Sequence, residues 1–345
     1  MKTLSGFFFS SIFLLCHSIS LNAAVVLQYH HIGEGTPRIT SATEQEFKQH
    51  LEWLKENGFK IISLVELTKR IRQKNLDELE KVVAITFDDQ GSSVCNTAWP
   101  ILKAYDYPFT VFVSGESIAS GNAGLCTIAQ LKAMLETGLL TIGNHGHQHL
   151  HMLDKSAFDN QQDWEQSIRK DILGAQKIIE SHLGEAPRLF AYPYGEANIE
   201  LEQLLEKLGY VSFGQQSGAI GNGSNLNLLP RFPLSGVYAN SETLVSKLNS
   251  LAFPIQESVI SNHPIKKASN DNPPSLELLL GEDFNASVQC YTGDGKKMLV
   301  KQQGARIFAK NDSPLSAGRA RYNCTAQSKY PGRFYWFSYQ WVIEN

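Results

Sequence analysis

The sequence has 345 residues, of which 42% are hydrophobic and 19% are charged. This composition is typical of a folded globular protein, and it excludes a disordered or collagen-like chain. The 31 basic and 34 acidic residues leave a net charge of −3, so we expect no nucleic-acid partner. The length favours about two domains, or one barrel with a smaller module.

The N-terminal segment has the pattern of a signal peptide. Lys2 supplies a positive charge, and residues 7–15 form an apolar run that is too short to span a bilayer. Small residues follow, and cleavage after Ala23 or after Ser20 fits the pattern. We therefore expect residues 1–23 to direct export. The mature protein is then periplasmic or extracellular and has no transmembrane anchor.

Four cysteines remain once this segment is removed: Cys95, Cys126, Cys290 and Cys324. An even number of cysteines in an oxidising compartment favours disulfides. They form two groups along the chain, so the simplest pairing is Cys95–Cys126 and Cys290–Cys324. Four buried free thiols are the alternative. No CxxC spacing occurs, which argues against a zinc site made of these thiols.

Short apolar runs alternate with amphipathic stretches from residue 25 to about residue 213. Thr43 and Glu46 form a capping box before a helix that ends near Gly58. Strands are predicted at residues 25–29, 60–64, 82–87, 110–113, 139–142, 188–191 and 210–213, and further helices at residues 98–105, 128–135, 168–183 and 199–208. Repeated strand–helix units predict an α/β fold with a mostly parallel sheet, either open or closed into a barrel.

The composition changes near His263. The segment KKASNDNPP at residues 266–274 is polar and contains prolines, as is typical of a linker. Beyond it, strands but no helices are predicted, at residues 276–280, 286–290, 298–301, 306–309 and 334–342. We therefore divide the mature chain into residues 24–265 and residues 266–345. The second part is predicted to be a small, all-β, sandwich-like module.

Two neighbouring carboxylates, Asp88 and Asp89, follow the strand at residues 82–87. Adjacent side chains at a strand end point in different directions, so one carboxylate can bind a metal while the other acts as a base. A solvated turn or a helix cap is the alternative for an isolated Asp-Asp pair. In parallel α/β folds, however, the chemistry lies at the carboxyl ends of the strands, where this pair is expected.

Four histidines follow the strand at residues 139–142: His145, His147, His149 and His151. Neutral imidazole is a common zinc ligand, and clustering allows several rings to reach one ion. In a helix His145 and His149 would share a face, whereas in an extended chain all four would do so. A histidine-rich surface loop is the alternative. Because both groups follow predicted strands, we expect them on one face of the sheet.

Taken together, these segments resemble the polysaccharide deacetylases with a NodB-type domain, the carbohydrate esterase family 4, over roughly residues 25–250. TFDD at residues 86–89 is similar to the first motif of that family. His145 and His149 resemble its HxxxH motif, and YPYGEAN at residues 192–198 resembles its third motif. The third motif, with LPR at residues 229–231, looks most like the branch that acts on poly-β-1,6-N-acetylglucosamine.

The resemblance implies a distorted (β/α) barrel and a hydrolase that removes N-acetyl groups from an N-acetylglucosamine polymer and releases acetate. Zn²⁺ or another divalent metal would be held by Asp89, His145 and His149, with Asp88 as the general base. The backbone N–H of Tyr194 would help to stabilise the oxyanion.

Some expectations about further side chains accompany the resemblance. Tyr192 and Tyr194 are candidates for stacking on sugar rings, although packing in the interior explains most aromatic residues equally well. His147 and His151 are expected in a surface loop.

The sequence departs from the family pattern in places. Gln90 stands where the family usually has glycine, and it would either crowd the site or contact a sugar. Ala191 replaces the usual arginine that orients the catalytic aspartate, and Arg231 is our candidate replacement. No clear motif for the general-acid histidine is found, and His263 adjoins the linker. Another type of metallohydrolase and a catalytically idle sugar-binding protein stay open, as do the polymer and the metal.

Overall fold

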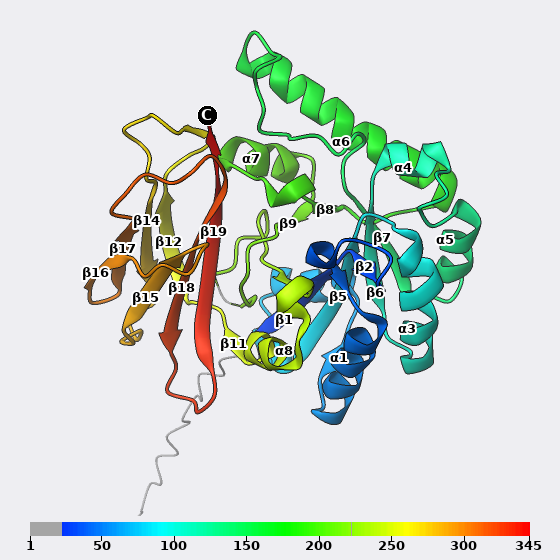
Figure 1. The fold of residues 1–345 in the computed structure, drawn as a ribbon, viewed down its shortest axis with the longest axis horizontal. Coiled ribbons are helices and arrows are strands. Elements are labelled where there is room, and N and C mark those ends of the chain that lie inside the picture. Colours follow the sequence, from blue (N-terminus) through cyan, green and yellow to red (C-terminus); the bar gives the residue numbers. More distant parts are fainter. Residues whose placement is uncertain (1–22, 222) are drawn as a thin grey trace, which may run out of the picture.

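The computed structural model describes residues 23–221 and 223–345, and it consists of a parallel α/β barrel packed against a β-sandwich (Figure 1). The predicted export segment lies outside these residues, apart from Ala23. None of the helices in the described part of the chain is long and apolar enough to cross a membrane.

The barrel is an eight-stranded sheet in which every strand pair is parallel, which confirms the predicted architecture. Its strands are β1 (Ala24–Tyr29), β4 (Lys60–Ile61), β5 (Val82–Asp88), β6 (Phe109–Val113), β7 (Leu140–Asn144), β8 (Leu189–Ala191), β9 (Val211–Phe213) and β10 (Phe232–Pro233). They follow the order β10-β1-β5-β6-β7-β8-β9, and β4 pairs with β5. The segment at residues 229–232 connects the two edges of the sheet. At one end Leu229 bridges to Phe213 of β9, and at the other Phe232 of β10 pairs with Leu27 of β1.

The helices cover the outside of this sheet, and most of them begin where a capping residue precedes an apolar pattern. They are α1 (Glu44–Glu56), α2 (Leu64–Arg72), α3 (Trp99–Tyr105), α4 (Gly115–Ser120), α5 (Ile128–Leu135), α6 (Gln161–Leu183), α7 (Ile199–Lys207) and α8 (Ser241–Leu248). The capping box of Thr43 and Glu46 is present as predicted. The predicted strand at residues 60–64 is shorter than expected, because the Ser63 side chain accepts the Glu66 N–H and starts α2.

The sandwich contains two sheets, as the alternating pattern of the C-terminal part predicts. One has the order β11-β19-β18-β15, with β13 also paired to β19, and the other has the order β12-β14-β17-β16. Their strands are β11 (Ser250–Leu251), β12 (Ile255–Ile260), β13 (Ile265–Lys266), β14 (Ser275–Leu280), β15 (Val288–Thr292), β16 (Leu299–Gln303), β17 (Arg306–Lys310), β18 (Gly318–Gln327) and β19 (Phe334–Glu344). A short pair, β2 (His31–Ile32) and β3 (Ser41–Ala42), lies outside these sheets.

The strand pairing corrects the position of the predicted linker. Residues 267–274 connect β13 to β14 and therefore lie inside the sandwich. β12 pairs with β14, and β11 pairs with β19, so the strands of the second module begin at Ser250. We accordingly propose a division near residue 250 in place of residue 265. The polar, proline-containing composition of this loop was misleading, because surface loops and linkers share it.

The strand β19 is buried on both faces, and this explains its unusual aromatic content. Trp341 and Ile343 point into the sandwich core, at 0% and 2% exposure. Successive side chains of a strand alternate between faces. Accordingly, Trp336 packs on Phe232 of the barrel with ring centroids 5.2 Å apart. The last strand of the sandwich is therefore also the wall that contacts the barrel.

Both predicted disulfides are present, Cys95–Cys126 and Cys290–Cys324. The second joins directly paired residues of β15 and β18. The first holds the segment that follows β5, where the Cys126 N–H also donates to the Gln90 carbonyl. This disulfide therefore fixes the chain just beyond the two neighbouring aspartates.

Candidate active site

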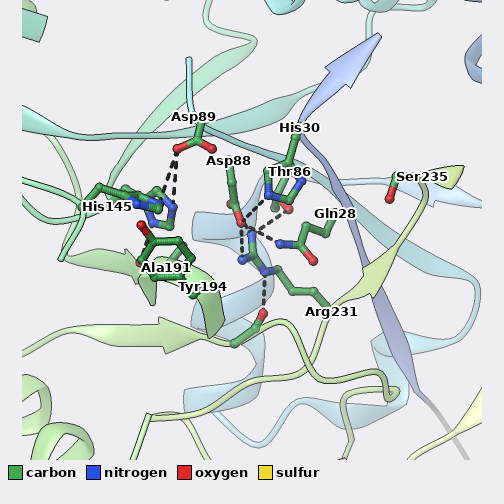
Figure 2. A network of polar contacts seen from close by, with 12 residues as sticks. Gln28, His30, Thr86, Asp88, Asp89, His145, Ala191, Tyr194, Arg231 and Ser235 are labelled. Carbon is green, nitrogen blue, oxygen red and sulfur yellow. Dashed lines mark hydrogen bonds and ion pairs between the residues drawn. The ribbon is translucent and has the colours of Figure 1, made fainter. Parts of the chain in front are cut away.

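The predicted chemistry-bearing residues gather at the carboxyl ends of β5 and β7 (Figure 2). Asp88 is the last residue of β5, and Asp89 follows it. His145 comes directly after β7. Neighbouring parallel strands end at the same edge of the sheet, so these side chains meet although nearly 60 residues separate them.

Asp88 is fully buried and is held by an arginine from a distant part of the chain. The Arg231 guanidinium donates from Nη1 to Asp88 Oδ1 at 2.6 Å and from Nη2 to Oδ2 at 2.8 Å. Gln28 Nε2 donates to the same Oδ2 at 2.6 Å. The structure thus places Arg231, the candidate replacement for the missing arginine, against the predicted base. The planar, two-point pairing fixes the orientation of the carboxylate.

Arg231 is itself 0% exposed, and its other polar contacts are made inside the barrel. Nε donates to the Gly214 carbonyl at 2.8 Å, and Nη1 also donates to Thr86 Oγ1 at 3.3 Å. Burial opposes ionisation of Asp88, but the positive charge of Arg231 outweighs it. The pKa of the Asp88 carboxyl therefore lies well below its ordinary value, and this carboxylate stays ionised.

Asp89 points away from Asp88 because its backbone adopts a left-handed conformation, with φ of 55°. Its Oδ1 lies 3.8 Å from His145 Nε2 and 3.7 Å from His149 Nε2. His145 Nδ1 donates to the Ala191 carbonyl at 2.7 Å, which orients Nε2 toward Asp89. Asp89, His145 and His149 thus form a compact cluster, and their ligand atoms lie within 4.8 Å of one another.

These distances fit a single metal ion. Ligand atoms that are each about 2.0–2.1 Å from a tetrahedral Zn²⁺ lie about 3.4 Å apart, close to the two separations between Asp89 Oδ1 and the imidazole nitrogens. The backbone carbonyl on His145 is the kind of outer contact that metal-binding histidines make. Burial, followed by the nearby His145, lowers the pKa of His149 and favours the neutral, ligating form.

The Tyr194 side chain borders this cluster. Its ring centroid lies 4.5 Å from that of His149, and the Tyr194 backbone is left-handed, with φ of 58°. A non-glycine residue in this conformation costs free energy and persists when its surroundings hold it. The next residue, Gly195, also has positive φ, and a Cβ there would lie 2.7 Å from the Gln215 side chain.

Two residues of the sandwich hold this loop. Gln340 Nε2 donates to the Tyr194 carbonyl at 3.3 Å and to the Gly195 carbonyl at 3.1 Å. Arg321 donates to Gln340 Oε1 at 3.1 Å, so the amide nitrogen faces the loop. Arg319 Nη1 donates to the Tyr194 carbonyl at 3.2 Å. The sandwich thus supplies contacts that position the backbone beside the cluster of Asp89, His145 and His149.

Sequence reasoning assigned no role to Gln28 and His30, which also face Asp88 (Figure 2). Gln28 is the one polar residue of β1, and His30 Nε2 lies 3.9 Å from Asp88 Oδ2. Burial lowers the pKa of His30, although Asp88 and Asp89 oppose that shift. A polar residue at the carboxyl end of an apolar strand was the signal that could have found them.

Two predicted sugar-contacting residues are corrected. Tyr192 is 0% exposed, and its hydroxyl donates to the Asn227 carbonyl at 2.6 Å, so it belongs to the barrel interior. Gln90 is 1% exposed, so it does not present its side chain to a sugar. Both residues flank the site in sequence, but the backbone direction turns their side chains inward.

The remaining histidines lie outside the ligand cluster. His147 is half-buried, and its ring packs against Gly115 at the start of α4. His263 is buried in the sandwich interface, where its Nδ1 accepts the Val342 N–H at 3.2 Å. His151 is exposed, as expected for a surface loop, but its ring stacks on Tyr194 with centroids 3.9 Å apart.

Comparison with known proteins extends these observations. The sequence model of the family described as polysaccharide deacetylase matches residues 75–213. A poly-β-1,6-N-acetyl-D-glucosamine N-deacetylase from Staphylococcus epidermidis is 30% identical over 233 residues, which cover 62% of this chain and 80% of the relative. The chain belongs to the polysaccharide deacetylase family. It is thereby assigned to the polysaccharide N-deacetylases, the class of enzyme that its sequence motifs predict.

Solved structures place the same fold in the barrel. The deacetylase PplD from Streptococcus pyogenes matches with a TM-score of 0.58 and 24% identity, over 66% of this chain and 98% of that one. IcaB from Ammonifex degensii matches with a TM-score of 0.57 and 25% identity, over 66% of this chain and 97% of that one. The match covers nearly all of each solved chain but only 66% of this one. About a third of this polysaccharide deacetylase therefore has no counterpart in those two structures.

Proposed function

We propose that this polysaccharide deacetylase is a metal-dependent hydrolase that removes N-acetyl groups from a β-1,6-linked N-acetylglucosamine polymer and releases acetate. The observation that carries the proposal is the buried Asp88–Arg231 pair beside the cluster of Asp89, His145 and His149. The choice of polymer rests on the similarity to the Staphylococcus epidermidis relative and on the sequence motifs.

Each side chain of the site has a distinct role in this proposal. Zn²⁺, or another divalent ion, held by Asp89, His145 and His149 would supply Lewis-acid polarisation of the acetamide carbonyl and activation of water. Asp88 would accept the proton of the attacking water, and the pairing with Arg231 keeps it ionised and oriented. The carbon–nitrogen bond of the amide would then break and leave acetate and a sugar amine.

The leaving amine needs a proton, and His30 is our candidate to carry it: burial keeps the imidazole neutral at rest, so it would first take the proton that Asp88 accepted from water and then pass it to the amine. Its Nε2 faces Asp88, and its side chain retains 19% exposure, so it borders the open side of the site. His263 is too deeply buried in the sandwich interface for this role. We further propose that the Tyr194 N–H assists at the developing oxyanion, and that the Tyr194 ring contacts the sugar.

The test of this function is acetate release from defined oligosaccharides, with and without a chelator. We expect release from β-1,6-linked N-acetylglucosamine oligomers, loss of release with chelator, and recovery when Zn²⁺ is added back. Chitin oligomers and peptidoglycan fragments are the competing substrates. Faster release from either of them would overturn the assignment of the polymer, and release unaffected by chelator would overturn the metal dependence.

Substitution of the proposed ligands tests the metal site directly. His145→Ala and His149→Ala should each strip the metal, as measured by elemental analysis of the purified protein, because three protein ligands leave little redundancy. His147→Ala is the matched control, since its ring packs on α4 outside the cluster. Loss of metal from the control with retention in His149→Ala would show that the ligands are misassigned.

We also propose that residues 1–23 direct export of the protein. The two disulfides support this proposal, because disulfides persist in oxidising compartments. N-terminal sequencing of the protein recovered outside the cytoplasm should show a chain that starts at or near residue 24. Recovery of an intact N-terminus from that fraction would contradict this expectation.

A further inference from the structure

A hollow lies beside Tyr194, between the barrel and the sandwich, and has no role in the chemistry described above. Its volume is about 350 Å³, and residues from both modules line it. His151, Asp154 and Glu196 come from the barrel, whereas Arg319 and Glu344 come from the sandwich. This volume lies near the lower end of the range for small-ligand pockets, which suits a single sugar ring.

Two ring contacts link the lining of the hollow to the candidate active site. The His149 and Tyr194 rings are 4.5 Å apart, and the His151 ring stacks on Tyr194 at 3.9 Å with an angle of 6° between the planes. His149 belongs to the proposed metal site, while His151 lines the hollow. The hollow thus lies two ring contacts away from the proposed metal site, close enough for a neighbouring unit of a bound chain molecule to be placed there.

The exposed ring of His151 is held in place. Its side chain is 60% exposed, yet its Nδ1 donates to Glu196 Oε2 at 2.9 Å, and Glu196 is only 6% exposed. Ordering an exposed side chain costs conformational entropy, and here a buried carboxylate and a stacked aromatic ring offset that cost. The result is a fixed aromatic platform that presents apolar surface to solvent, which is suited to the C–H faces of a sugar ring.

The other lining residues offer hydrogen-bond partners for hydroxyl groups. Arg319 uses one of its five N–H donors on the Tyr194 carbonyl, and its guanidinium lies 5.7 Å from the Tyr194 ring centroid. Asp154 and Glu344 are exposed carboxylates that can accept from hydroxyl or ammonium groups. Donors, acceptors and a stacking surface thus converge on one hollow, which matches the surface chemistry of a pyranose.

We propose that this hollow is a subsite for the sugar that neighbours the reacting unit of the polymer. The inference rests on the proposed function, and it adds a substrate-binding role for the sandwich through Arg319 and Glu344. The recognised chemistry is a β-linked hexosamine ring, either acetylated or already de-acetylated. Occupation of the hollow makes the enzyme more efficient on long chains than on single sugars.

The chain-length dependence of the reaction tests the subsite. The readout is the ratio of kcat/KM for a β-1,6-linked pentasaccharide to that for the disaccharide, with acetate as the measured product. His151→Ala and Glu344→Gln should each lower this ratio about tenfold, mainly through the KM of the pentasaccharide. His182→Ala and Glu282→Gln, which change exposed residues outside the hollow, are the matched controls. An unchanged ratio in both test variants, or an equal fall in the controls, overturns the subsite.

A binding measurement separates the subsite from the proposed function. Calorimetric titration with fully de-acetylated pentasaccharide needs no turnover, and both variants should weaken its Kd at least fivefold relative to the wild type. If Glu344→Gln loses more affinity for the de-acetylated pentasaccharide than for the acetylated one, Glu344 contacts the ammonium group. If the wild type binds these ligands but releases no acetate, the proposed function fails and the subsite stands. Equal binding by the wild type and both variants overturns the subsite.

Discussion

The barrel and the sandwich contribute to the same site in different ways. The barrel supplies ionisable side chains from strand ends, such as Asp88, Asp89 and His145, and all of them lie in short sequence motifs. The sandwich supplies Gln340 and Arg319, which contact main-chain carbonyls of one loop. Under the proposed function, the barrel would determine which reaction is possible, whereas the contacts from the sandwich hold one loop of the barrel.

The largest effects on activity should come from substituting the two aspartates of the barrel one at a time. Asp88→Asn should keep the metal but lower kcat by about 10²-fold or more, the usual scale of general base catalysis. Asp89→Asn should release the metal, because Asp89 belongs to the ligand cluster. Metal content and single-turnover acetate release measure the two effects. Equal metal loss in both variants would abolish the proposed division of roles.

A smaller effect is expected from the sandwich side. Gln340→Ala removes two hydrogen bonds to the Tyr194 loop and leaves the Gly195 carbonyl without its side-chain donor, whereas the Tyr194 carbonyl keeps Arg319. It should lower kcat about tenfold, equivalent to about 1.4 kcal/mol, within the usual cost of leaving one buried carbonyl without a partner. Metal affinity should stay within twofold, because no metal ligand is altered. Gln303→Ala, at an exposed end of β16, is the control. A variant with wild-type kcat would show that the sandwich does not position the loop.

The contact between Gln340 and the Tyr194 loop predicts the outcome of a truncation that the sequence alone would suggest. A chain that ends near residue 265 keeps the predicted catalytic part but lacks β18 and β19, and with them Arg319 and Gln340. It also leaves β11 and β12 without their partners. We therefore expect this truncation to lose activity even on short oligomers, as measured by acetate release.

A different kind of effect, on stability and not on activity, is expected at the interface itself as a dependence on pH. Burial lowers the pKa of His263 to about 4 from its ordinary value of 6.5. The unfolded chain therefore binds a proton first, and stability is lost as the pH falls from 6.5 toward 4. Between pH 7.5 and pH 4.5 this residue should cost about 2–3 kcal/mol in the free energy of unfolding.

His263→Asn tests this dependence, because the asparagine oxygen can accept the Val342 N–H in place of Nδ1. Urea denaturation at both pH values should show a smaller acid loss in this variant than in the wild type. The control is His182→Asn on the exposed end of α6. If His263→Asn and the wild type lose stability in parallel, the buried imidazole is not the source.

The sequence predicts the barrel and its charged residues well, because each rests on a local pattern. The run VVAITFD identifies β5 and the carboxylates at its end, and the capping box identifies α1. The pairing of Asp88 with Arg231 could be suggested only through the family resemblance, since 143 residues separate the two. A contact over such a distance depends on how the sheet closes, which no local pattern encodes.

The sequence analysis misassigned or missed three other features, each for a different physical reason. Tyr192 was misassigned because a residue beside a motif can point to either side of the backbone, and here it faces the interior. The strand β18 was overlooked because polar residues alternate with Tyr322, Cys324 and Ala326, although this period-two pattern is itself a strand signal. Arg319 and Gln340 carried no local signal, since their role depends on the packing of the sandwich against the barrel.

The contact between Gln340 and Tyr194 also sets an order of assembly. The two residues are 146 positions apart, and β19 enters the fold after every strand of the barrel has been synthesised. Ordering chain over long separations slows folding, so neighbouring barrel strands should pair before this contact forms. We therefore expect the aspartates and histidines to be gathered while the Tyr194 loop is still free. Pulse-labelling hydrogen exchange should accordingly protect the amides of β5 to β7, and those of the local β18–β19 hairpin, before the amides of Gly195 and Glu196 in the Tyr194 loop.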